Sequence, residues 1–388
     1  MWWTVMRDAL VVLALASFAY YVVAIIAALR FFGARRMRDA VPSDFTPPLS
    51  ILKPIYGLDR ETYENYASFC LQDYPDYEIL FCVSDDQDPA IPVIAELARN
   101  FPERSIQLVV GSEPLGVSDK VNKLCRMVRA AAHEIVVVSD SDVRVGPGYL
   151  RAIATPFRDP KVGAVTCLYR GLTDGSLAAN LEAIGNSTDF TAGVLVAWLL
   201  GDMNFTLGAT MATTKARLAE IGGFESLVDH FSDDYELGNR IAAGGHRVVL
   251  SNFPVSIVYP EQTLGDAFRH QLRWNLSIRY SRPAGHLGLI FTQGLALTLL
   301  AAVFAPSAAW AVALMVGYLV LRGASAWIIG VWGMGDGLLR GKMELLPLRD
   351  LFAFLVWVVS FFPQRIHWRG KEFYVREKRL VAAGTRER

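Results

Sequence analysis

Three apolar stretches indicate where the chain meets a membrane. Residues 9–29 carry no charged side chain over 21 positions, and a helix of that length crosses a hydrocarbon core of about 30 Å. Residues 287–321 are uncharged over 35 positions and are broken at Ala305-Pro306-Ser307, which predicts a helical hairpin whose second arm continues past Arg322 towards Gly335. Residues 351–363 add 13 uncharged positions, too few to cross a bilayer unaided.

Basic residues beside these stretches predict the topology. Four arginines between Arg30 and Arg38 follow the first stretch, whereas a cleaved signal peptide carries its positive charges first. We therefore expect an anchor, with the chain after it in the cytoplasm. Residues 364–388 carry eight Lys or Arg against three Glu, which predicts a cytoplasmic tail. Residues 351–363 are then expected to enter the membrane without crossing it, because a crossing would contradict the charge rule.

Between the apolar stretches, short β-rich runs alternate with segments of helical spacing. The predicted strands are residues 50–53, 78–83, 106–110, 134–140 and 163–169, and the predicted helices are residues 60–71, 90–100 and 120–132. This alternation favours an α/β fold with a mostly parallel sheet covered on both faces, whose ligands bind at the carboxyl ends of the strands. We expect four regions: a transmembrane anchor (1–32), a cytoplasmic α/β domain (45–283), transmembrane or re-entrant helices (284–363) and a basic cytoplasmic tail (364–388).

Composition excludes several classes of function. Of 388 residues, 53% are hydrophobic, and 38 Lys and Arg balance 38 Asp and Glu. A neutral chain lacks the positive field that nucleic-acid binding uses, so no nucleic-acid partner is expected. Neither GxGxxG nor GxxxxGK[ST] occurs, which removes the main support for a dinucleotide or P-loop site. The cysteines lack CxxC spacing and are expected to be reduced core residues: Cys70, Cys82, Cys125 and Cys167.

Acidic residues follow two of the predicted strands at the expected ligand-binding edge. Asp85 lies in the segment 83–89, and Asp140 and Asp142 follow the apolar run 135–138. An Asp-x-Asp turn offers two carboxylates, a set of oxygen ligands suited to Mg²⁺ or Mn²⁺ bridging a diphosphate. The alternative is an Asx-type turn without a ligand, but the position directly after a strand favours metal binding.

A third acidic segment, residues 229–236, contains four acids, among them Asp229, Asp233 and Asp234. At helical spacing these like charges lie side by side, which is costly for a purely structural helix. The alternative is a solvated helix start with Ser232 or Asp233 as N-cap. A carboxylate held beside another acid can be tuned to accept a proton from an alcohol, and Asp234 is the candidate base.

A fourth segment, residues 269–275, precedes the predicted hairpin. Arg273 offers a delocalised cation for phosphate, and Trp274 suits the membrane–water interface. Arg and Trp beside a membrane helix also serve as simple anchors, but the acidic segments earlier in the chain favour a functional role.

In order along the chain, these sites are Asp85; Asp140 and Asp142; Asp234; and Arg273 with Trp274. They resemble the D, DxD, D, (Q/R)xxRW pattern of processive and lipid-linked family 2-like glycosyltransferases. Within that group the whole chain resembles the ceramide glucosyltransferases of family 21 and the related bacterial hopanoid-associated glycosyltransferases. One position departs from the pattern, because His270 stands where Gln or Arg is expected. Either His270 fills that role, or the neighbouring Arg269 or Gln271 does.

The resemblance implies a GT-A fold and transfer with inversion at the sugar carbon. It implies that Asp85 contacts the uracil side of a UDP-sugar, that Asp140 and Asp142 hold Mn²⁺ or Mg²⁺ and the diphosphate, and that Asp234 is the general base. Lys120 would add a positive charge on the donor side. His270, Arg273 and Trp274 would complete the donor site, with Arg273 and Trp274 over the diphosphate near the membrane.

The expected function is therefore a multi-pass membrane enzyme, of a bacterial inner membrane or its equivalent, that moves glucose from a UDP-sugar to a hydroxyl of a ceramide-like lipid. One alternative is an N-acetylglucosaminyltransferase acting on a hopanoid-type lipid. Others are a polysaccharide synthase and a scaffold that binds nucleotide sugars without catalysis. Residues 192–201, too short to span, either shape an acceptor tunnel facing the bilayer or form a buried domain helix.

Overall fold

A computed structural model describes residues 2–38, 44–362, 366–368, 371–376 and 378–382. These residues belong to two compact units. The sheet unit contains residues 39–169, 203–260 and 365–388, and the helical unit contains residues 1–38, 170–202 and 261–364. Pro363 and residues 364–365, 369–370, 377 and 383–388 of the predicted tail lie outside the described residues.

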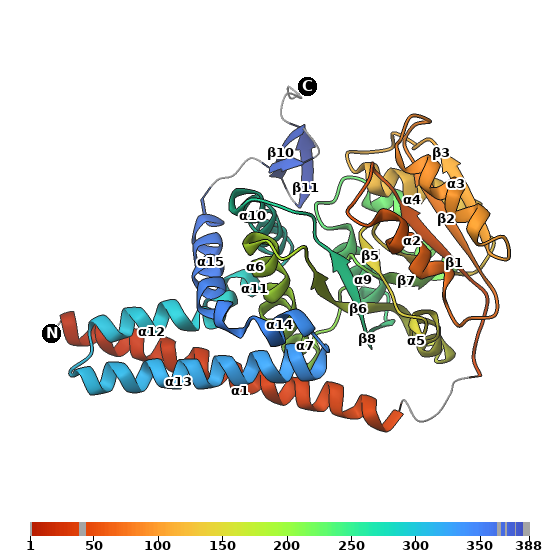
Figure 1. Ribbon diagram of the computed structural model, residues 1–388. Coiled ribbons are helices and arrows are strands. Elements are labelled where there is room, and N and C mark those ends of the chain that lie inside the picture. The colour runs from red at the N-terminus through yellow and green to blue at the C-terminus, as the bar shows by residue number, and fades with distance from the viewer. Residues whose placement is uncertain (1, 39–43, 363–365, 369–370, 377, 383–388) are drawn as a thin grey trace. The chain divides into compact units, whose positions relative to one another are not determined.

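The sheet unit is built on eight strands in the order β3-β2-β1-β4-β7-β6-β8-β5 (Figure 1). Its parallel half contains β1 (Leu49–Pro54), β2 (Tyr77–Val83), β3 (Ser105–Val110) and β4 (Ile135–Val138). Its antiparallel half contains β5 (Val143–Arg144), β6 (Val162–Leu172), β7 (Met211–Thr214) and β8 (Arg247–Val258). The α/β fold expected as GT-A is therefore confirmed, with an antiparallel half that the sequence did not reveal.

Helices cover this sheet because their apolar positions recur with helical spacing. In α4, Val121, Leu124 and Cys125 pack into one core with Leu52 of β1 and Leu80 of β2, as expected for an apolar stripe at i, i+3 and i+4. All four cysteines are free and buried, as predicted. The helices of this unit are α2 (Thr62–Cys70), α3 (Ala90–Asn100), α4 (Asp119–Ala130), α5 (Tyr149–Ala154), η1 (Thr155–Arg158), α8 (Lys215–Glu220), η3 (Phe224–Leu227) and α9 (Asp233–Ala243).

The predicted tail contains strands. β9 (Ile366–Trp368), β10 (Lys371–Arg376) and β11 (Arg379–Ala382) form an antiparallel sheet. Its last strand also pairs with the segment before α9, because Leu380 N donates a hydrogen bond to Asp229 O at 2.8 Å and Phe231 N donates one to Lys378 O at 3.1 Å. The tail is therefore an integral part of the sheet unit.

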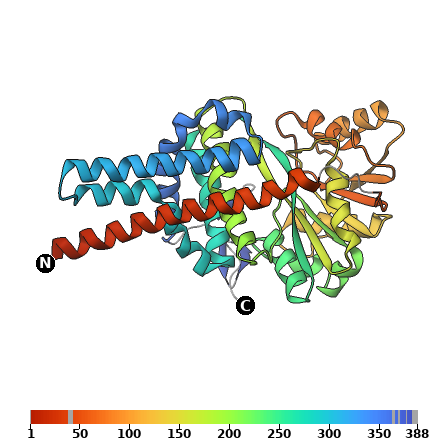
Figure 2. The ribbon, with the colours of Figure 1, turned by 90° about the horizontal axis from the view of Figure 1, so that it is seen from below.

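In the helical unit, α1, α12 and α13 lie side by side (Figures 1 and 2). Ala14 of α1, Leu297 of α12 and Leu314 of α13 are buried in one cluster. The elements of this unit are α1 (Trp2–Arg38), α6 (Leu177–Gly185), η2 (Asn186–Phe190), α7 (Thr191–Leu199), α10 (Leu264–Ser281), α11 (Pro283–Gly288), η4 (Leu289–Thr292), α12 (Gly294–Val303), α13 (Ala308–Ala326), η5 (Trp327–Gly333), α14 (Gly337–Gly341), η6 (Met343–Leu345) and α15 (Leu346–Val359).

Among the described residues, two helical segments are long and apolar enough to cross a membrane, Trp2–Gly33 and Ala308–Gly333. The segments Pro283–Thr292 and Gly294–Val303 are bent by 58° and add a third if they are counted as one span. The predicted hairpin is present as α12 and α13, broken where Pro306 stands. α15, with 14 residues, is shorter than a span, in keeping with the expectation for residues 351–363. The predicted short helix at 192–201 corresponds to α7, whose Trp198 packs edge-on against Phe31 of α1.

Candidate active site

The Asp-x-Asp turn begins where β4 ends. β4 is buried along its length, and Ser139 N donates a hydrogen bond to Leu52 O of β1 at 3.1 Å, so that Asp140 is the first residue free of the sheet. Val258 N of β8 donates to Asp142 O at 2.9 Å, which fixes the second aspartate. Because β1, β2 and β4 are parallel, this turn and the acidic segment after β2 lie at the same edge, as predicted.

Lys120, in the first turn of α4, joins two of the acidic segments. Its Nζ lies 2.7 Å from Asp140 Oδ1 and 3.6 Å from Asp233 Oδ2. Burial lowers the pKa of Lys120, but the attraction of Asp140 and Asp233 outweighs burial and raises this pKa well above its ordinary value. Lys120 is therefore a permanent cation between the DxD turn and α9.

Asp234 faces the same space as Asp140, beside Gly208. A Cβ atom on Gly208 would lie 3.3 Å from Asp234 Oδ2 and 3.5 Å from Asp140 Oδ2, so a side chain there would crowd both carboxylates. Burial and the neighbouring Asp233 raise the pKa of Asp234 to about 6, although Lys120 acts in the opposite direction. A carboxylate with a pKa near neutral is suited to accept a proton from a hydroxyl.

Close packing holds the start of α9 in this position. Thr206 Oγ1 donates a hydrogen bond to Asp234 O at 2.6 Å. A Cβ atom on Gly238, one turn later, would lie 2.3 Å from Thr206 N, so only glycine lets the helix approach this backbone. The position of Asp234 is therefore set by the backbone of residues 205–206 as well as by its own helix.

Lys53 is a member of the site that the sequence analysis missed. It is fully buried near the end of β1; its Nζ donates a hydrogen bond to Asp140 O at 2.8 Å and lies 3.8 Å from the centroid of the Phe69 ring. Burial lowers the pKa of Lys53 to about 7, although Asp142 and Asp140 act to raise it. Lys53 thus supports the backbone of the DxD turn from inside the sheet unit, and its only sign in the sequence is a cation within the apolar run LSILKP.

The DxD turn fits a divalent cation that also binds a diphosphate. Burial and the nearby Asp140 raise the pKa of Asp142, against the effect of Lys53, and a cation would relieve this crowding of negative charge. Among the described residues, no group of three or more His, Cys, Asp and Glu side chains could hold a metal ion. Two carboxylates suffice for Mn²⁺ or Mg²⁺ when phosphate oxygens and water supply the remaining ligands.

Asp85 lies at the same sheet edge, after β2. Its carboxylate is exposed, and Oδ1 accepts a hydrogen bond from Gln87 N at 2.9 Å, which closes the turn after the strand. The preceding Ser84 donates to Asp119 Oδ1 of α4 at 2.9 Å, and Asp119 pairs with the buried Lys123 at 2.8 Å. The turn that carries Asp85 is therefore tied to the helix that carries Lys120.

His270, Arg273 and Trp274 lie on α10, in the helical unit. A capping box of Thr263 and Asp266 begins this helix. The His270 and Trp274 rings pack against each other at a tilt of 57° with centroids 4.6 Å apart, and His270 Nδ1 lies 2.6 Å from Glu182 Oε1. Burial raises the pKa of Glu182, but its hydrogen bonds to His270, Gln262 and Gln271 prevail and hold it below its ordinary value. Glu182 is the second residue that sequence reasoning missed.

The structure distinguishes the three candidates for the Gln or Arg position of the pattern. Arg269 has an exposed side chain and pairs with Asp266 at 2.5 Å. Gln271 is buried and has both ends of its amide hydrogen-bonded, to Glu182 and to Arg349. His270 is half-buried and packs against the Trp274 ring, which makes it the candidate best placed to act together with the Arg-Trp pair.

Comparison with known proteins identifies relatives that match most of the chain. A sequence profile of glycosyl transferase family 21 matches residues 9–381. Ceramide glucosyltransferase 1 of Caenorhabditis elegans is 26% identical over 363 residues, which cover 88% of this chain and 75% of that protein. Ceramide glucosyltransferase 3 of the same nematode is 25% identical over 378 residues, which cover 92% of this chain and 79% of that protein.

Solved structures with similar folds are more distant. The mannosyltransferase PcManGT of Pyrobaculum calidifontis, in complex with GDP-Man and Mn²⁺, aligns over 90% of this chain and 99% of its own at 18% identity and a TM-score of 0.48. Glucosyl-3-phosphoglycerate synthase of Mycobacterium tuberculosis, with Mn²⁺, UDP and glucosyl-3-phosphoglycerate, aligns over 66% and 80% at 16% identity and a TM-score of 0.35. At TM-scores below 0.5 these backbones differ too much from this chain to inform its site.

Proposed function

Because the chain belongs to glycosyl transferase family 21, we propose that it transfers glucose from UDP-glucose to a hydroxyl of a ceramide-like membrane lipid, with inversion at the sugar carbon. The two nematode relatives, both ceramide glucosyltransferases, support a lipid acceptor. The observation that carries the proposal is the meeting of Asp140 and Asp234 beside Gly208, with Lys120 between the two acidic segments.

Three groups of the sheet unit bind the donor in this proposal. Asp140 and Asp142 hold Mn²⁺ or Mg²⁺, which when bound neutralises the negative charge that develops on the departing diphosphate. Lys120 adds a fixed positive charge beside Asp140. Asp85, exposed after β2, contacts the uracil side of the nucleotide.

Asp234 is the general base. It takes the proton of the acceptor hydroxyl while the hydroxyl oxygen forms a bond to the sugar C1, and the bond from C1 to the β-phosphate oxygen breaks. The electron pair of that bond leaves with UDP. One displacement inverts the configuration at C1, so an α-linked donor yields a β-glucoside. The raised pKa of Asp234 and its place opposite Asp140 support this role.

The α10 residues complete the donor site in this proposal. Arg273 binds the diphosphate, for which a guanidinium is well suited, and Trp274 lies beside it at the membrane–water interface. His270 takes the place of the usual Gln or Arg. The buried carboxylate of Glu182, 2.6 Å from His270 Nδ1, supports this assignment, because it orients the ring.

We also propose that the sheet unit is cytoplasmic and that the amino terminus is outside. The tail is hydrogen-bonded within the sheet unit, so the chain between Pro260 and Arg365 crosses the membrane an even number of times. Two crossings satisfy this condition if α15 enters the membrane without crossing: one by α13, and one by Pro283–Thr292 and Gly294–Val303 taken together as one bent span. The positive charges after α1 and in the tail agree with this orientation.

The test is reconstitution of the full chain in lipid vesicles. UDP-glucose with ceramide should give UDP release and a β-glucosylated lipid detected by mass spectrometry, and both should require Mn²⁺ or Mg²⁺. A parallel reaction with UDP-N-acetylglucosamine and a hopanoid tests the alternative substrates. Lipid product formed only from UDP-N-acetylglucosamine and the hopanoid would mean that these are the substrates. Donor binding with no lipid product in either reaction would indicate a scaffold.

A further inference from the structure

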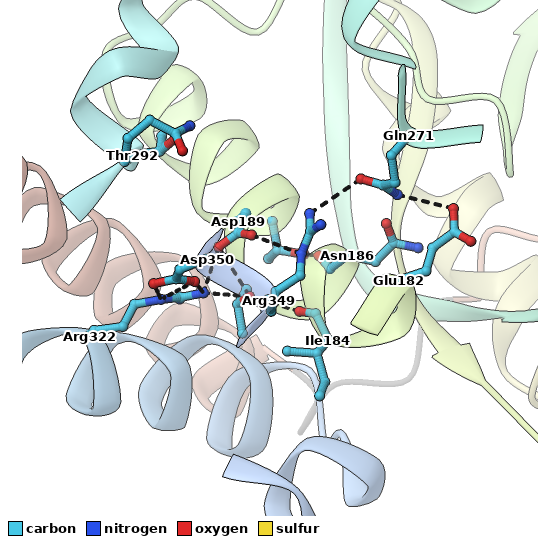
Figure 3. A network of polar contacts seen from close by, with 12 residues as sticks. Glu182, Ile184, Asn186, Asp189, Gln271, Thr292, Arg322, Arg349 and Asp350 are labelled. Carbon is cyan, nitrogen blue, oxygen red and sulfur yellow. Dashed lines mark hydrogen bonds and ion pairs between the residues drawn. The ribbon is translucent and has the colours of Figure 1, made fainter. Parts of the chain in front are cut away.

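A chain of charged side chains runs through the helical unit (Figure 3): Arg322, Arg349 and Asp350 are buried, and Asp189 is partly buried. Arg322 of α13 and Asp350 of α15 form an ion pair at 2.8 Å, and their side chains are only 4% and 5% exposed. Arg322 also pairs with Asp189 at 2.7 Å, and Asp189 Oδ2 lies 3.2 Å from Arg349 Nε. Two cations and two anions therefore balance one another, as buried charges require.

This network ends on α10, the helix of the Arg273-Trp274 pair. Arg349 Nη2 donates a hydrogen bond to Gln271 Oε1 at 3.2 Å, and Gln271 Nε2 donates one to Glu182 Oε1 at 3.0 Å (Figure 3). Gln271 and the Glu182 side chain are buried. If α10 turned about its axis, the amide, the carboxylate and the guanidinium would each lose a buried partner, and such losses are costly.

Arg349 is closely fitted to its place on α6. A Cβ atom on Gly185 would lie 2.3 Å from Arg349 Nε and 2.5 Å from its Cζ, so the guanidinium packs directly on a helix that has no side chain there. One arginine reaches Asp189 and Gln271 through different nitrogens. A lysine has a single nitrogen and cannot reproduce this fork.

We propose that Arg349 and Glu182 are positioning residues that hold α10 so that Arg273 and Trp274 meet the donor. The proposal rests on the donor-binding role proposed for that pair. Glu182 Oε1 accepts a hydrogen bond from Gln271 Nε2 and lies 2.6 Å from His270 Nδ1. It therefore fixes two consecutive residues of the helix. At about 100° per residue, Arg273 lies about 200° around the helix from Gln271, on the side away from the network. Arg349 of α15 and Glu182 of α6 thus hold one side of the helix at Gln271 and His270, and Arg273 lies on the opposite side.

The test measures UDP affinity in the presence of Mn²⁺ by calorimetry, together with the unfolding temperature, on the full chain in detergent. Arg349→Met should weaken UDP binding at least about tenfold. The double variant Arg349→Met/Gln271→Leu leaves neither side of the Arg349–Gln271 hydrogen bond unpaired, but it still removes a cation of Asp189 and a donor of Glu182, so it should bind UDP as weakly as Arg349→Met. Arg349→Lys, a milder change, should give an intermediate affinity.

Two controls separate positioning from stability. Tyr318→Phe removes a buried hydrogen bond of 2.6 Å to Asp350, away from α10, and Arg340→Met removes an exposed arginine of α14. Both should bind UDP within about twofold of the unmodified chain. The proposal is overturned if the double variant binds UDP normally, or if Tyr318→Phe loses as much affinity as Arg349→Met. If the unmodified chain binds UDP but glucosylates no lipid, the proposed function is wrong. The positioning proposal is still tested in that case, because the UDP affinities of the variants are measured without a lipid acceptor.

Discussion

Replacing Asp234 by Asn should stop sugar transfer while preserving donor binding. The amide is nearly isosteric with the carboxylate but cannot accept the proton of the hydroxyl. General base catalysis contributes about 10²–10⁴ in rate, so we expect kcat to fall at least about 100-fold, with the Kd for UDP within about threefold of the unmodified chain. Asp233→Asn is the matched control, because Asp233 precedes Asp234 in the same helix and faces Lys120 at 3.6 Å.

The raised pKa of Asp234 also predicts how much kcat changes with pH. With a pKa of about 6, Asp234 is about 97% ionised at pH 7.5 and about 9% ionised at pH 5. The base is lost as the pH falls through this raised pKa, so kcat should fall about tenfold between pH 7.5 and pH 5. An aspartate at its ordinary pKa of 3.8 would still be about 94% ionised at pH 5 and would leave the rate almost unchanged.

The assay follows initial rates of glucolipid formation from saturating UDP-glucose and ceramide in vesicles, with the Kd for UDP measured at each pH. A flat profile between pH 5 and pH 7.5, with unchanged UDP binding, would refute the assignment of a raised pKa to the base. If Asp233→Asn is inactive and Asp234→Asn is active, the base is Asp233 instead.

Three further predictions concern the metal, the buried lysine and the topology. EDTA should abolish UDP release and Mn²⁺ should restore it, and Asp142→Ala should lose most activity while the protein still folds; full activity in EDTA would contradict the metal site. Lys53→Met should lower kcat/KM at least about tenfold, because the Asp140 carbonyl loses the hydrogen bond from Lys53 Nζ. The unfolding temperature should stay within about 5 °C, because the variant also removes a buried cation. Unchanged kinetics would mean that Lys53 does not support the turn. A cysteine at Thr385→Cys, outside the described residues, should resist a membrane-impermeant maleimide in intact cells, whereas Trp2→Cys should react. Labelling of Thr385→Cys from outside would mean that residues 351–363 cross the membrane.

Apolar runs predicted the parallel half of the sheet, because three of its four strands, β1, β2 and β4, are buried along their whole length. β4 is wholly Val and Ile, and β1 and β2 contain the apolar cores Ile51-Leu52 and Ile79–Val83, so these strands are visible without a structure. β7 is the four-residue run MATT, too short and too polar to stand out. The run that forms β6 looks the same in a parallel or an antiparallel pairing, so its direction could not be read from its residues.

The candidate site was predictable where its chemistry is local. Asp140 and Asp142 stand together in the sequence, and their place after a strand is visible there. Lys53 and Glu182 were missed because each is a single charged residue in an apolar run. The role of each depends on a partner far along the chain: Lys53 binds Asp140, 87 positions away, and Glu182 binds His270. Such pairs exist only once the chain has folded.

The pairing of β11 with residues 229–231 can form only at a late stage of the synthesis of the protein. Leu380, which donates to Asp229 O, leaves the ribosome after α12 and α13. The segment before α9 therefore waits for its partner strand until both arms of the membrane hairpin have been made. The sheet unit is therefore completed only at the end of synthesis, when the strand that pairs with the segment before α9 has been translated. A premature stop codon before position 380 would remove the same strand even though every acidic motif had already been translated.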